Sequence, residues 1–403
     1  MKILYITYEG FDTPNAANQM AETMINAFLE QGHTVYLIQS HRKGVNSDIP
    51  KSLEGKENFF CETIKRKVVD KTRFVKRYLN EFKYAFQAKK KWKKIKDADL
   101  IYVQSNPTIL YTMLLLKLFK RKIPIVYSIY DVFPGHAYDI GVIKSKTVYN
   151  ILRLLQKPCY KMAKEITVLS GDMRKNVIGQ GAKAECVHVV PAWYDVKTTK
   201  EISRQENRFI KRYKMPTDKF YVQFAGTIGY VFNYRTIIEL AKRLKQERDI
   251  VIQIVGDGTV KNKFEDVTRT EHLDNIQFYP LQPIELVPDV YSACDVCVIP
   301  LMRGVIWSGV PSKAPILMAC RRVIVNSVEK ESQYAKMYAE KDMGIAVDID
   351  DYDGLAEAVK MLHSSPETVE RMADNAYSFV QENYSSTQSI SKLLEVFSKA
   401  VKN

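Results

Sequence analysis

The residues best suited to hold a phosphate lie in two loops of the second half of the chain. Gly226 and Thr227 follow the apolar run Phe220–Ala225, and Gly256 follows the next apolar run, Ile250–Val255. Glycine lets the backbone approach a ligand closely, and free amides in such a turn can hold phosphate oxygens. A tight turn between a strand and a helix would need the same glycines, so this pattern alone leaves both interpretations open.

A Ser-Lys pair further along the chain is a stronger signal for an anion. We predict that Ser312 caps the N-terminus of a short helix and that Lys313 lies in its first turn. A lysine there opposes the positive end of the helix dipole unless an anion is bound nearby. Arg303, in the preceding loop, could supply a second positive charge. These residues together predict a diphosphate site.

An acidic side chain in the first half of the chain could act on a substrate hydroxyl. Asp131 comes directly after the apolar run Pro124–Tyr130, and His136 follows in the same loop. A carboxylate at the end of a strand can orient or polarise a hydroxyl group. The alternative is an Asp that caps a turn beside an exposed His. We expect Asp131 to be functional and leave His136 open.

A basic segment carries most of the net charge of +14. Between Lys65 and Lys96, fourteen Lys and Arg residues stand against Asp70 and Glu81, which leaves +12 in this segment alone. Phe74, Tyr78, Phe82 and Phe86 form an apolar stripe at helical spacing within it. The ordinary interpretation is a core-facing stripe with a solvated basic face, but the charge exceeds what solubility requires.

We therefore predict that the segment binds an anionic membrane surface, since each basic residue near such a surface contributes about 1 kcal/mol. Nucleic acid is not expected, because no nucleic-acid module accompanies the charge. The residues predicted to face the membrane are Lys76, Arg77, Lys83, Lys89, Lys90, Lys91, Trp92, Lys93 and Lys94.

Short apolar runs alternate with helical patterns along both halves of the chain. Continuous apolar strands separated by helices predict parallel sheets that are covered on both faces. The pattern restarts after a polar stretch near residues 192–219. We therefore predict an α/β protein with two Rossmann-like, doubly wound domains that face a central cleft. The predicted domains are 1–195 and 200–384, and a C-terminal helix within 385–403 is expected to pack back on the first domain.

Composition excludes several other classes. The six cysteines are scattered, and Cys294 and Cys297 have no second pair to complete a zinc site. The longest apolar run, Thr108 to Leu116, is too short to span a bilayer, which needs about 20 residues. The N-terminal apolar run lacks the features of a signal peptide. We predict a cytoplasmic protein with no essential metal and no cofactor, peripheral on the inner face of the plasma membrane.

Together these loops resemble glycosyltransferase family 4, which has the two-domain GT-B fold, and they are most similar to the bacterial branch that adds acetamido sugars to lipid-linked surface polysaccharides. The resemblance covers nearly the whole chain, and its strength lies in the order of its landmarks. These are Gln31–Val35, Asp131–Pro134, Val168–Met173, Val189–Pro191, Ala225–Gly229, Ile254–Gly258 and Val310–Lys313.

The resemblance implies a retaining, metal-independent hexosyltransferase. Its donor would be a nucleoside-diphosphate sugar, expected to be uridine-linked, bound to the second domain by Gly226, Thr227, Gly256, Arg303, Ser312 and Lys313. Its acceptor would be a polyprenyl-diphosphate-linked glycan on the first domain, near Asn15 and Asn18, with Asp131 and His136 as catalytic residues.

The chain departs from the family at its donor contacts. The family's ribose-binding Glu falls at Ile316, and the glycine-loop Asn falls at Thr227. Two alternatives therefore stay open. One is a non-catalytic GT-B scaffold protein in a polysaccharide assembly complex, which the missing Glu favours. The other is a sugar-nucleotide epimerase, which would need neither a lipid acceptor nor the basic stripe.

Overall fold

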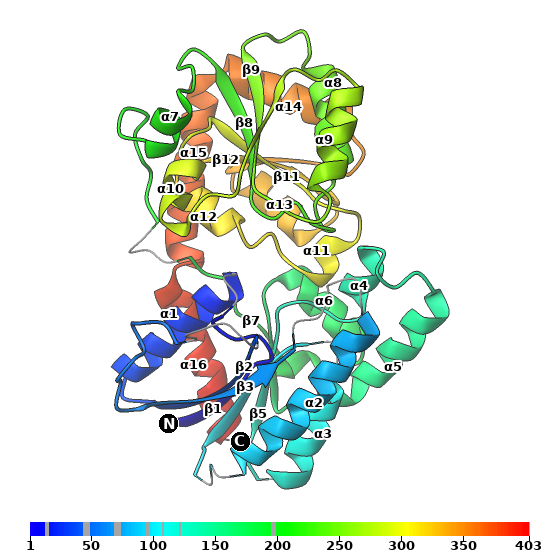
Figure 1. Ribbon diagram of the computed structural model, residues 1–403, viewed down its shortest axis with the longest axis vertical. Coiled ribbons are helices and arrows are strands. Elements are labelled where there is room, and N and C mark those ends of the chain that lie inside the picture. Colours follow the sequence, from blue (N-terminus) through cyan, green and yellow to red (C-terminus); the bar gives the residue numbers. More distant parts are fainter. Residues whose placement is uncertain are drawn as a thin grey trace. The chain divides into compact units, whose positions relative to one another are not determined.

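The structure is a computed structural model that describes residues 1–12, 16–42, 49–67, 74–93, 95, 97–106, 109–120, 122–194 and 199–402, without the side chains of residues 16, 74, 75, 77 and 78. Contacts divide the chain into two compact units. The first contains Met1–Tyr138, Ile143–Ala192 and Ser386–Asn403, and the second contains Asp139–Val142 and Trp193–Ser385. The first unit begins at the N-terminus and ends with the C-terminal helix (Figure 1).

The first unit is built on a parallel sheet of seven strands in the order β3-β2-β1-β4-β5-β6-β7. Strand β1 lies between β2 and β4, with Tyr5 opposite Leu37 on one side and Tyr102 on the other. The strands are β1 (Lys2–Ile6), β2 (Thr34–Arg42), β3 (Phe59–Arg66), β4 (Leu100–Gln104), β5 (Ile125–Ile129), β6 (Glu165–Val168) and β7 (Val187–Val189).

Helices connect these strands, as parallel pairing requires. They are α1 (Ala16–Glu30), α2 (Phe74–Trp92), α3 (Ile109–Phe119), α4 (Gly135–Asp139), α5 (Lys146–Met162) and α6 (Gly171–Gly179), with a short 3₁₀ turn at Ala184–Cys186. The last helix, α16 (Ser386–Lys402), returns to this unit and contacts β4, β5 and β6. Its Phe397 ring lies 5.6 Å from that of Phe28 and 5.2 Å from that of Tyr102.

The second unit has a parallel sheet of six strands in the order β10-β9-β8-β11-β12-β13. The strands are β8 (Phe220–Ala225), β9 (Ile250–Val255), β10 (Ile276–Tyr279), β11 (Val296–Pro300), β12 (Val323–Ser327) and β13 (Gly344–Val347). Both faces are apolar, and each is covered by its own core cluster. This two-sided burial explains why the strands are nearly continuous apolar runs.

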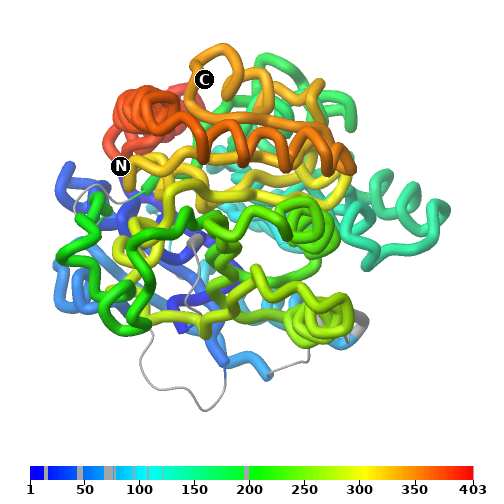
Figure 2. Tube along the Cα trace, turned by 90° about the horizontal axis from the view of Figure 1, so that it is seen from above, coloured from blue at the N-terminus to red at the C-terminus, as the bar shows by residue number. Residues whose placement is uncertain are grey.

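Helices cover both faces of this second sheet. One core includes side chains of α8 (Tyr234–Arg243), α9 (Lys261–Thr270) and α14 (Tyr352–Ser364), and α8 and α9 lie side by side (Figure 2, green and yellow-green). The other core includes side chains of α7 (Arg208–Tyr213), α10 (Val287–Tyr291), α11 (Val305–Ser308), α12 (Ala314–Ala319) and α13 (Gln333–Glu340). Helix α15 (Pro366–Asn383) contributes to both.

The predicted α/β class with two doubly wound sheets is confirmed. The sequence patterns missed one strand, β3, because its residues mix polar and apolar types. Strand β3 is at the edge of the sheet and is largely half-buried, so it lacks the continuous apolar run of an interior strand.

Candidate functional site

Each sheet reverses its strand order at one point, and ligands of such sheets bind beyond the carboxyl ends of the strands at that point. In the second unit the reversal lies between β8 and β11. Gly226 directly follows β8, and Gly256 directly follows the neighbouring strand β9. A Cβ atom on Gly256 would lie 2.0 Å from the carbonyl oxygen of Gly226, and both glycines have positive φ angles. The two strand ends are therefore in direct backbone contact, and no other residue type fits there.

The ammonium group of Lys313 lies directly over Gly226. A Cβ atom on Gly226 would be 2.6 Å from Lys313 Nζ, and that nitrogen is 3.8 Å from the centre of the Phe224 ring. Lys313 is half-buried, and no carboxylate pairs with it within the described part of the chain. Burial lowers the pKa of its ammonium to about 7. An unpaired cation at this strand end is electrostatically suited to an anionic ligand.

The predicted helix cap at Ser312 is wrong. Helix α12 begins at Ala314, Lys313 occupies the cap position, and no side chain in the described part of the chain caps the helix. The amide of Ala314 donates to the carbonyl of Pro311, which makes the entry a turn, and Ser312 is exposed. The turn reverses the expected roles, because it brings the lysine inward to β8 and turns the serine to solvent.

Arg303 is engaged elsewhere. Its guanidinium donates to the carbonyl of Ile349 at 3.1 Å and to Asp350 Oδ2 at 3.2 Å, and more than half of the side chain is exposed. Asp350 in turn accepts from the Tyr352 hydroxyl. The expected second free charge is thus already compensated, and Arg303 can reach an anion only if this ion pair opens.

The glycine loop offers fewer free amides than its sequence indicates. The amide of Gly226 donates to the carbonyl of Val255 at 2.9 Å, and that of Ile228 donates to the carbonyl of Asp257 at 2.9 Å. Within the described residues, the amides of Thr227 and Gly229 have no such acceptor. Thr227 is an exposed residue, and its amide is therefore a candidate donor to a ligand. Gly226 contributes mainly by leaving room for the lysine.

Glu329 is a buried acid that the sequence patterns did not single out. It lies two residues beyond β12 and is only 3% exposed. Its Oε1 accepts from the amide of Gly304 at 2.6 Å, while Oε2 is buried and has no hydrogen-bond partner among the described residues. Its position after a strand end is the signal that could have found it, as for Asp131.

In the first unit, Asp131 and His136 lie near each other beyond β5. His136 Nδ1 is 4.0 Å from Asp131 Oδ1, which is too long for a hydrogen bond. Asp131 is well exposed, whereas His136 Nδ1 is buried without a partner in the described structure. The backbone amide of His136 donates to the carbonyl of Val132, which starts α4. The arrangement leaves the Asp131 carboxylate free to contact a substrate.

The two predicted acceptor-side residues have different outcomes. Asn18, in the first turn of α1, donates from Nδ2 to the carbonyl of Gly10 at 2.7 Å. Its amide nitrogen therefore holds the loop that follows β1. Asn15 lies outside the described residues.

The basic segment forms helix α2, and its cations differ in their surroundings. Lys76, Lys83 and Lys90 are exposed, as is Lys93 just beyond the helix, whereas Lys91 pairs with Glu62 at 2.7 Å. Lys89 and Lys93 lie 3.8 and 4.9 Å from the centre of the Phe119 ring on α3. Lys94 and the side chain of Arg77 lie outside the described residues.

Trp92 does not face a membrane, and that prediction is wrong. Its side chain is fully buried. Trp92 lies on the face of α2 that also buries Glu81, Ala85 and Ala88, which follow one another at helical spacing. The stripe with Phe82 and Phe86 is on another face, and both rings are substantially exposed. The alternative interpretation, a core-facing stripe, therefore does not hold for the two stripe rings that the structure describes.

Two family models match the chain and together cover most of it. The model described as "Glycosyltransferase Family 4" matches residues 17–198, and the model described as "Glycosyl transferases group 1" matches residues 205–379. The first match lies largely in the first unit and the second match in the second unit.

Curated proteins and solved structures agree with these models. The "Probable glycosyltransferase WbjE" of Pseudomonas aeruginosa is 23% identical over 73% of this chain and 73% of its own length. The "Putative colanic acid biosynthesis glycosyl transferase WcaI" of Escherichia coli is 26% identical over 45% of this chain and 44% of its own. The crystal structure of Anabaena Alr3699/HepE in complex with UDP matches with a TM-score of 0.73 at 15% identity, covering 99% of this chain and all of the other.

Proposed function

We propose, from the premise that the chain belongs to the glycosyltransferases with family 4 and group 1 domains, that it is a retaining transferase for a nucleoside-diphosphate sugar. The donor binds the second unit at the ends of β8, β9 and β11. The acceptor is a lipid-linked surface-polysaccharide precursor, a polyprenyl-diphosphate-linked glycan that binds the first unit at the cytoplasmic face of the membrane.

The observation that carries this proposal is the Lys313 ammonium above Gly226. The donor diphosphate becomes the leaving group, so negative charge increases on its oxygens as the glycosidic bond breaks. A fixed cation in a half-buried position stabilises that charge more strongly than a solvated one would. Lys313 has no acidic partner among the described residues, so no ion pair has to be broken before the diphosphate binds.

The donor is proposed to carry uridine and an acetamido hexose. A complex with UDP is described for the Anabaena protein, whose fold this chain shares. The name of WcaI, which refers to colanic acid biosynthesis, supports a surface-polysaccharide product. The sugar itself rests on the family resemblance, and a panel of nucleotide sugars tests it.

The chemistry is divided between the units in this proposal. Lys313 and the Thr227 amide hold the diphosphate, and Asp131 accepts a hydrogen bond from a hydroxyl of the sugar or the acceptor. His136 lies beside that carboxylate. The positive charge of Lys313 takes the place of a metal ion, so the reaction proceeds without one. Retention of configuration is read from the anomeric signal of the product by NMR.

Calorimetric titration with UDP tests the donor site. Replacing Lys313→Met keeps the length of the side chain and removes its charge, so we expect UDP affinity to fall about tenfold to a hundredfold. The matched control is Lys245→Met, because Lys245 is exposed between the end of α8 and the start of β9, whereas the glycine turns follow the other ends of β8 and β9. Equal UDP affinity in both variants would rule out this donor site.

A non-catalytic scaffold remains the second candidate, because Ile316 occupies the position of the family's ribose-binding Glu. Turnover with a panel of donors and a polyprenyl-diphosphate acceptor distinguishes the two candidates. A scaffold binds the nucleotide sugar without cleaving it, so no nucleoside diphosphate forms. The transferase produces one nucleoside diphosphate for each sugar that it transfers.

A further inference from the structure

Helix α5 of the first unit exposes two of its three leucines and buries a glutamine. Gln156 is 4% exposed and donates from Nε2 to the Tyr127 hydroxyl at 2.9 Å. The adjacent Leu154 and Leu155 are 64% and 50% exposed. Exposed leucines are normal when isolated, but a buried polar side chain beside a contiguous exposed apolar patch marks a surface that binds another protein or a membrane.

The exposed apolar side chains continue from α5 to α3. On α5, Val148 and Ile151 share the outer face with Leu155, at spacings of three and four residues. On α3, which contacts α5, Leu118 is 64% exposed and Phe119 is also exposed. The two helices thus present a joint apolar surface.

Helix α2 completes this surface. The rings of Phe82 and Phe86 lie 5.2 and 4.9 Å from that of Tyr111 on α3, so their outer sides extend the same face. We name this surface the apolar face. Its exposed members are Leu79, Phe82, Phe86, Leu114, Leu118, Phe119, Val148, Ile151, Leu154 and Leu155.

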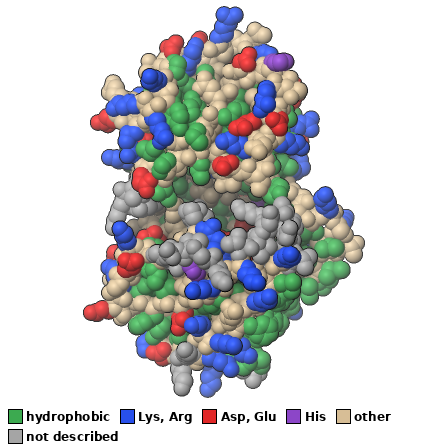
Figure 3. Space-filling view, viewed as in Figure 1, with side chains coloured by type: hydrophobic (Ala, Val, Ile, Leu, Met, Phe, Trp, Pro, Cys, Tyr) green, Lys and Arg blue, Asp and Glu red, His purple; other side chains and the backbone are tan. Residues whose placement is uncertain are grey.

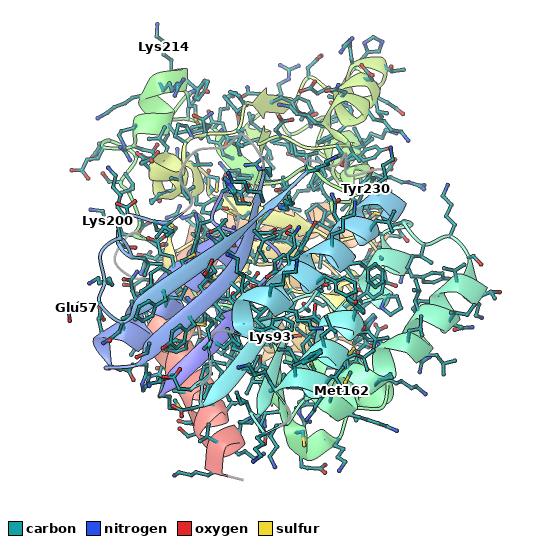
Figure 4. The ribbon with its side chains drawn as sticks, turned by 60° about the horizontal axis from the view of Figure 1, so that its bottom comes forward. Glu57, Lys93, Met162, Lys200, Lys214 and Tyr230 are labelled. Atoms are coloured by element: carbon teal, nitrogen blue, oxygen red, sulfur yellow. The ribbon has the colours of Figure 1, made fainter. Side chains whose placement is uncertain are left out.

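The figures place the apolar face on one side of the first unit. Hydrophobic side chains interspersed with Lys and Arg cover the region of α2, α3 and α5 (Figure 3, lower right). The ends of α2 and α5, near the labelled Lys93 and Met162, both lie on the side turned forward in Figure 4.

The charge on these three helices is almost entirely positive. They carry eleven Lys and Arg residues and one acid, Glu81, which is buried. Lys91 is the one of these cations that pairs with a carboxylate among the side chains that the structure describes. An apolar surface rimmed by cations that, apart from Lys91, have no carboxylate partner among the described side chains matches the interface of a bilayer, where acyl chains lie beneath anionic phosphates.

We propose that the apolar face inserts into the interface of an anionic bilayer, with its leucines among the upper acyl carbons and its lysines at the lipid phosphates. The proposal rests on the membrane-bound function above and deepens it, because attachment depends on apolar insertion as well as on charge. A second copy of the chain would bring two strongly basic surfaces together, which disfavours that occupant. No described helix is long and apolar enough to cross the bilayer, so the face lies along its surface.

Vesicle flotation with the full chain tests the proposal. We use vesicles of phosphatidylcholine alone and of phosphatidylcholine with about a third phosphatidylglycerol, at about 0.15 M and about 1 M salt, where the Debye length falls from about 8 to about 3 Å. Wild-type protein is expected to bind the anionic vesicles at low salt and to remain partly bound at high salt. A purely electrostatic contact would be lost at high salt.

The decisive variant is Leu118→Gln with Leu154→Gln. It should bind anionic vesicles on the order of tenfold more weakly at low salt and lose binding at high salt, since insertion affinity scales with buried apolar area. The matched control is Leu281→Gln with Ile284→Gln, which removes two exposed apolar side chains from the second unit. The control should bind as the wild type does.

Three results would overturn the proposal. The first is equal vesicle binding by the leucine variant and its control, and the second is no wild-type binding to anionic vesicles. The third is a dimer in sedimentation that the leucine variant converts to a monomer while vesicle binding is unchanged, which would assign the face to a second copy. UDP affinity is measured on the same variants without vesicles, so failure here and failure of the donor site are distinguishable.

Discussion

Two regions of the molecule differ from the usual arrangement of charged side chains outside and apolar side chains inside, and they differ in opposite ways. They are the donor-side loops of the second unit and the outer helices of the first unit. In the second unit a cation, Lys313, is turned inward without an acidic partner among the described residues. In the first unit large apolar side chains such as Leu118 and Leu154 are turned outward. Each arrangement costs free energy in water. In our proposals, this difference reflects two different ligands, an anion for the second unit and a bilayer for the first.

The largest expected effect tests whether the second unit binds the donor diphosphate while the first unit supplies the catalytic carboxylate. Replacing Asp131→Asn should lower turnover about a hundredfold or more, because the amide cannot accept a proton or stabilise charge as the carboxylate does. UDP affinity should stay within about twofold, because Asp131 contacts the sugar or the acceptor in the proposal. Donor turnover and UDP calorimetry measure the two quantities. A parallel loss of UDP affinity would contradict the division.

The second effect is on the free energy of unfolding, which the buried charge of Lys313 should lower. The pKa of Lys313 is about 7 in the folded protein and 10.5 when unperturbed. The unfolded chain therefore binds more protons between these pH values, so wild-type stability rises with pH across that interval. At pH 6.5, Lys313→Met should raise the free energy of unfolding by about 2 kcal/mol, after allowance for partial exposure.

Urea unfolding at pH 6.5 and at pH 9.5 measures this difference. The gain should shrink at the higher pH, where the wild-type lysine is largely neutral in the folded state. A variant that is less stable than wild type at pH 6.5 would show that Lys313 is a structural residue, and the comparison between the two regions would fail.

The pH dependence of UDP binding tests whether the Lys313 ammonium contacts the bound diphosphate. The bound diphosphate favours the protonated form of Lys313, whose pKa of about 7 in the free protein leaves it increasingly neutral at higher pH. UDP affinity should fall about tenfold between pH 7 and pH 8.5, since each pH unit above the free pKa costs up to about tenfold. Lys313→Met should remove this dependence. A flat wild-type profile would show that the ammonium does not contact the anion.

The smallest expected effect comes from removing divalent metal. In the proposed mechanism Lys313 supplies the positive charge that a metal ion would otherwise supply to the diphosphate. EDTA at millimolar concentration should therefore change donor turnover by less than about twofold. Strong inhibition that magnesium or manganese reverses would mean that a metal ion, and not the lysine alone, neutralises the leaving group.

The sequence was sufficient for the main architecture because parallel sheets covered on both faces need continuous apolar strands. All six strands of the second unit coincide with apolar runs, and β8 and β9 begin and end at the predicted residues. The glycines at their ends were also readable from the sequence, because positive φ angles and backbone contact demand that residue type. Strand β3 could not be predicted in this way, because it is an edge strand of mixed polar and apolar composition.

Side-chain direction was much harder to predict. Ser312 and Lys313 are adjacent, and a turn of one or two residues decides which of them faces β8. Trp92 and Phe86 lie on the same helix, and only the neighbouring elements decide which face of that helix is buried. No sequence motif marks Glu329, which is of interest because its buried Oε2 has no hydrogen-bond partner among the residues that the structure describes.

By itself the sequence determined the class of fold, the glycine turns and the excess of positive charge, because these depend on residue type and local spacing. Only the tertiary structure decided that Lys313 is the inward cation, that Arg303 pairs with Asp350 and that α5 exposes two of its leucines. The physical reason is that burial and charge pairing are made by residues far apart in the chain, and local patterns carry no information about which of them meet.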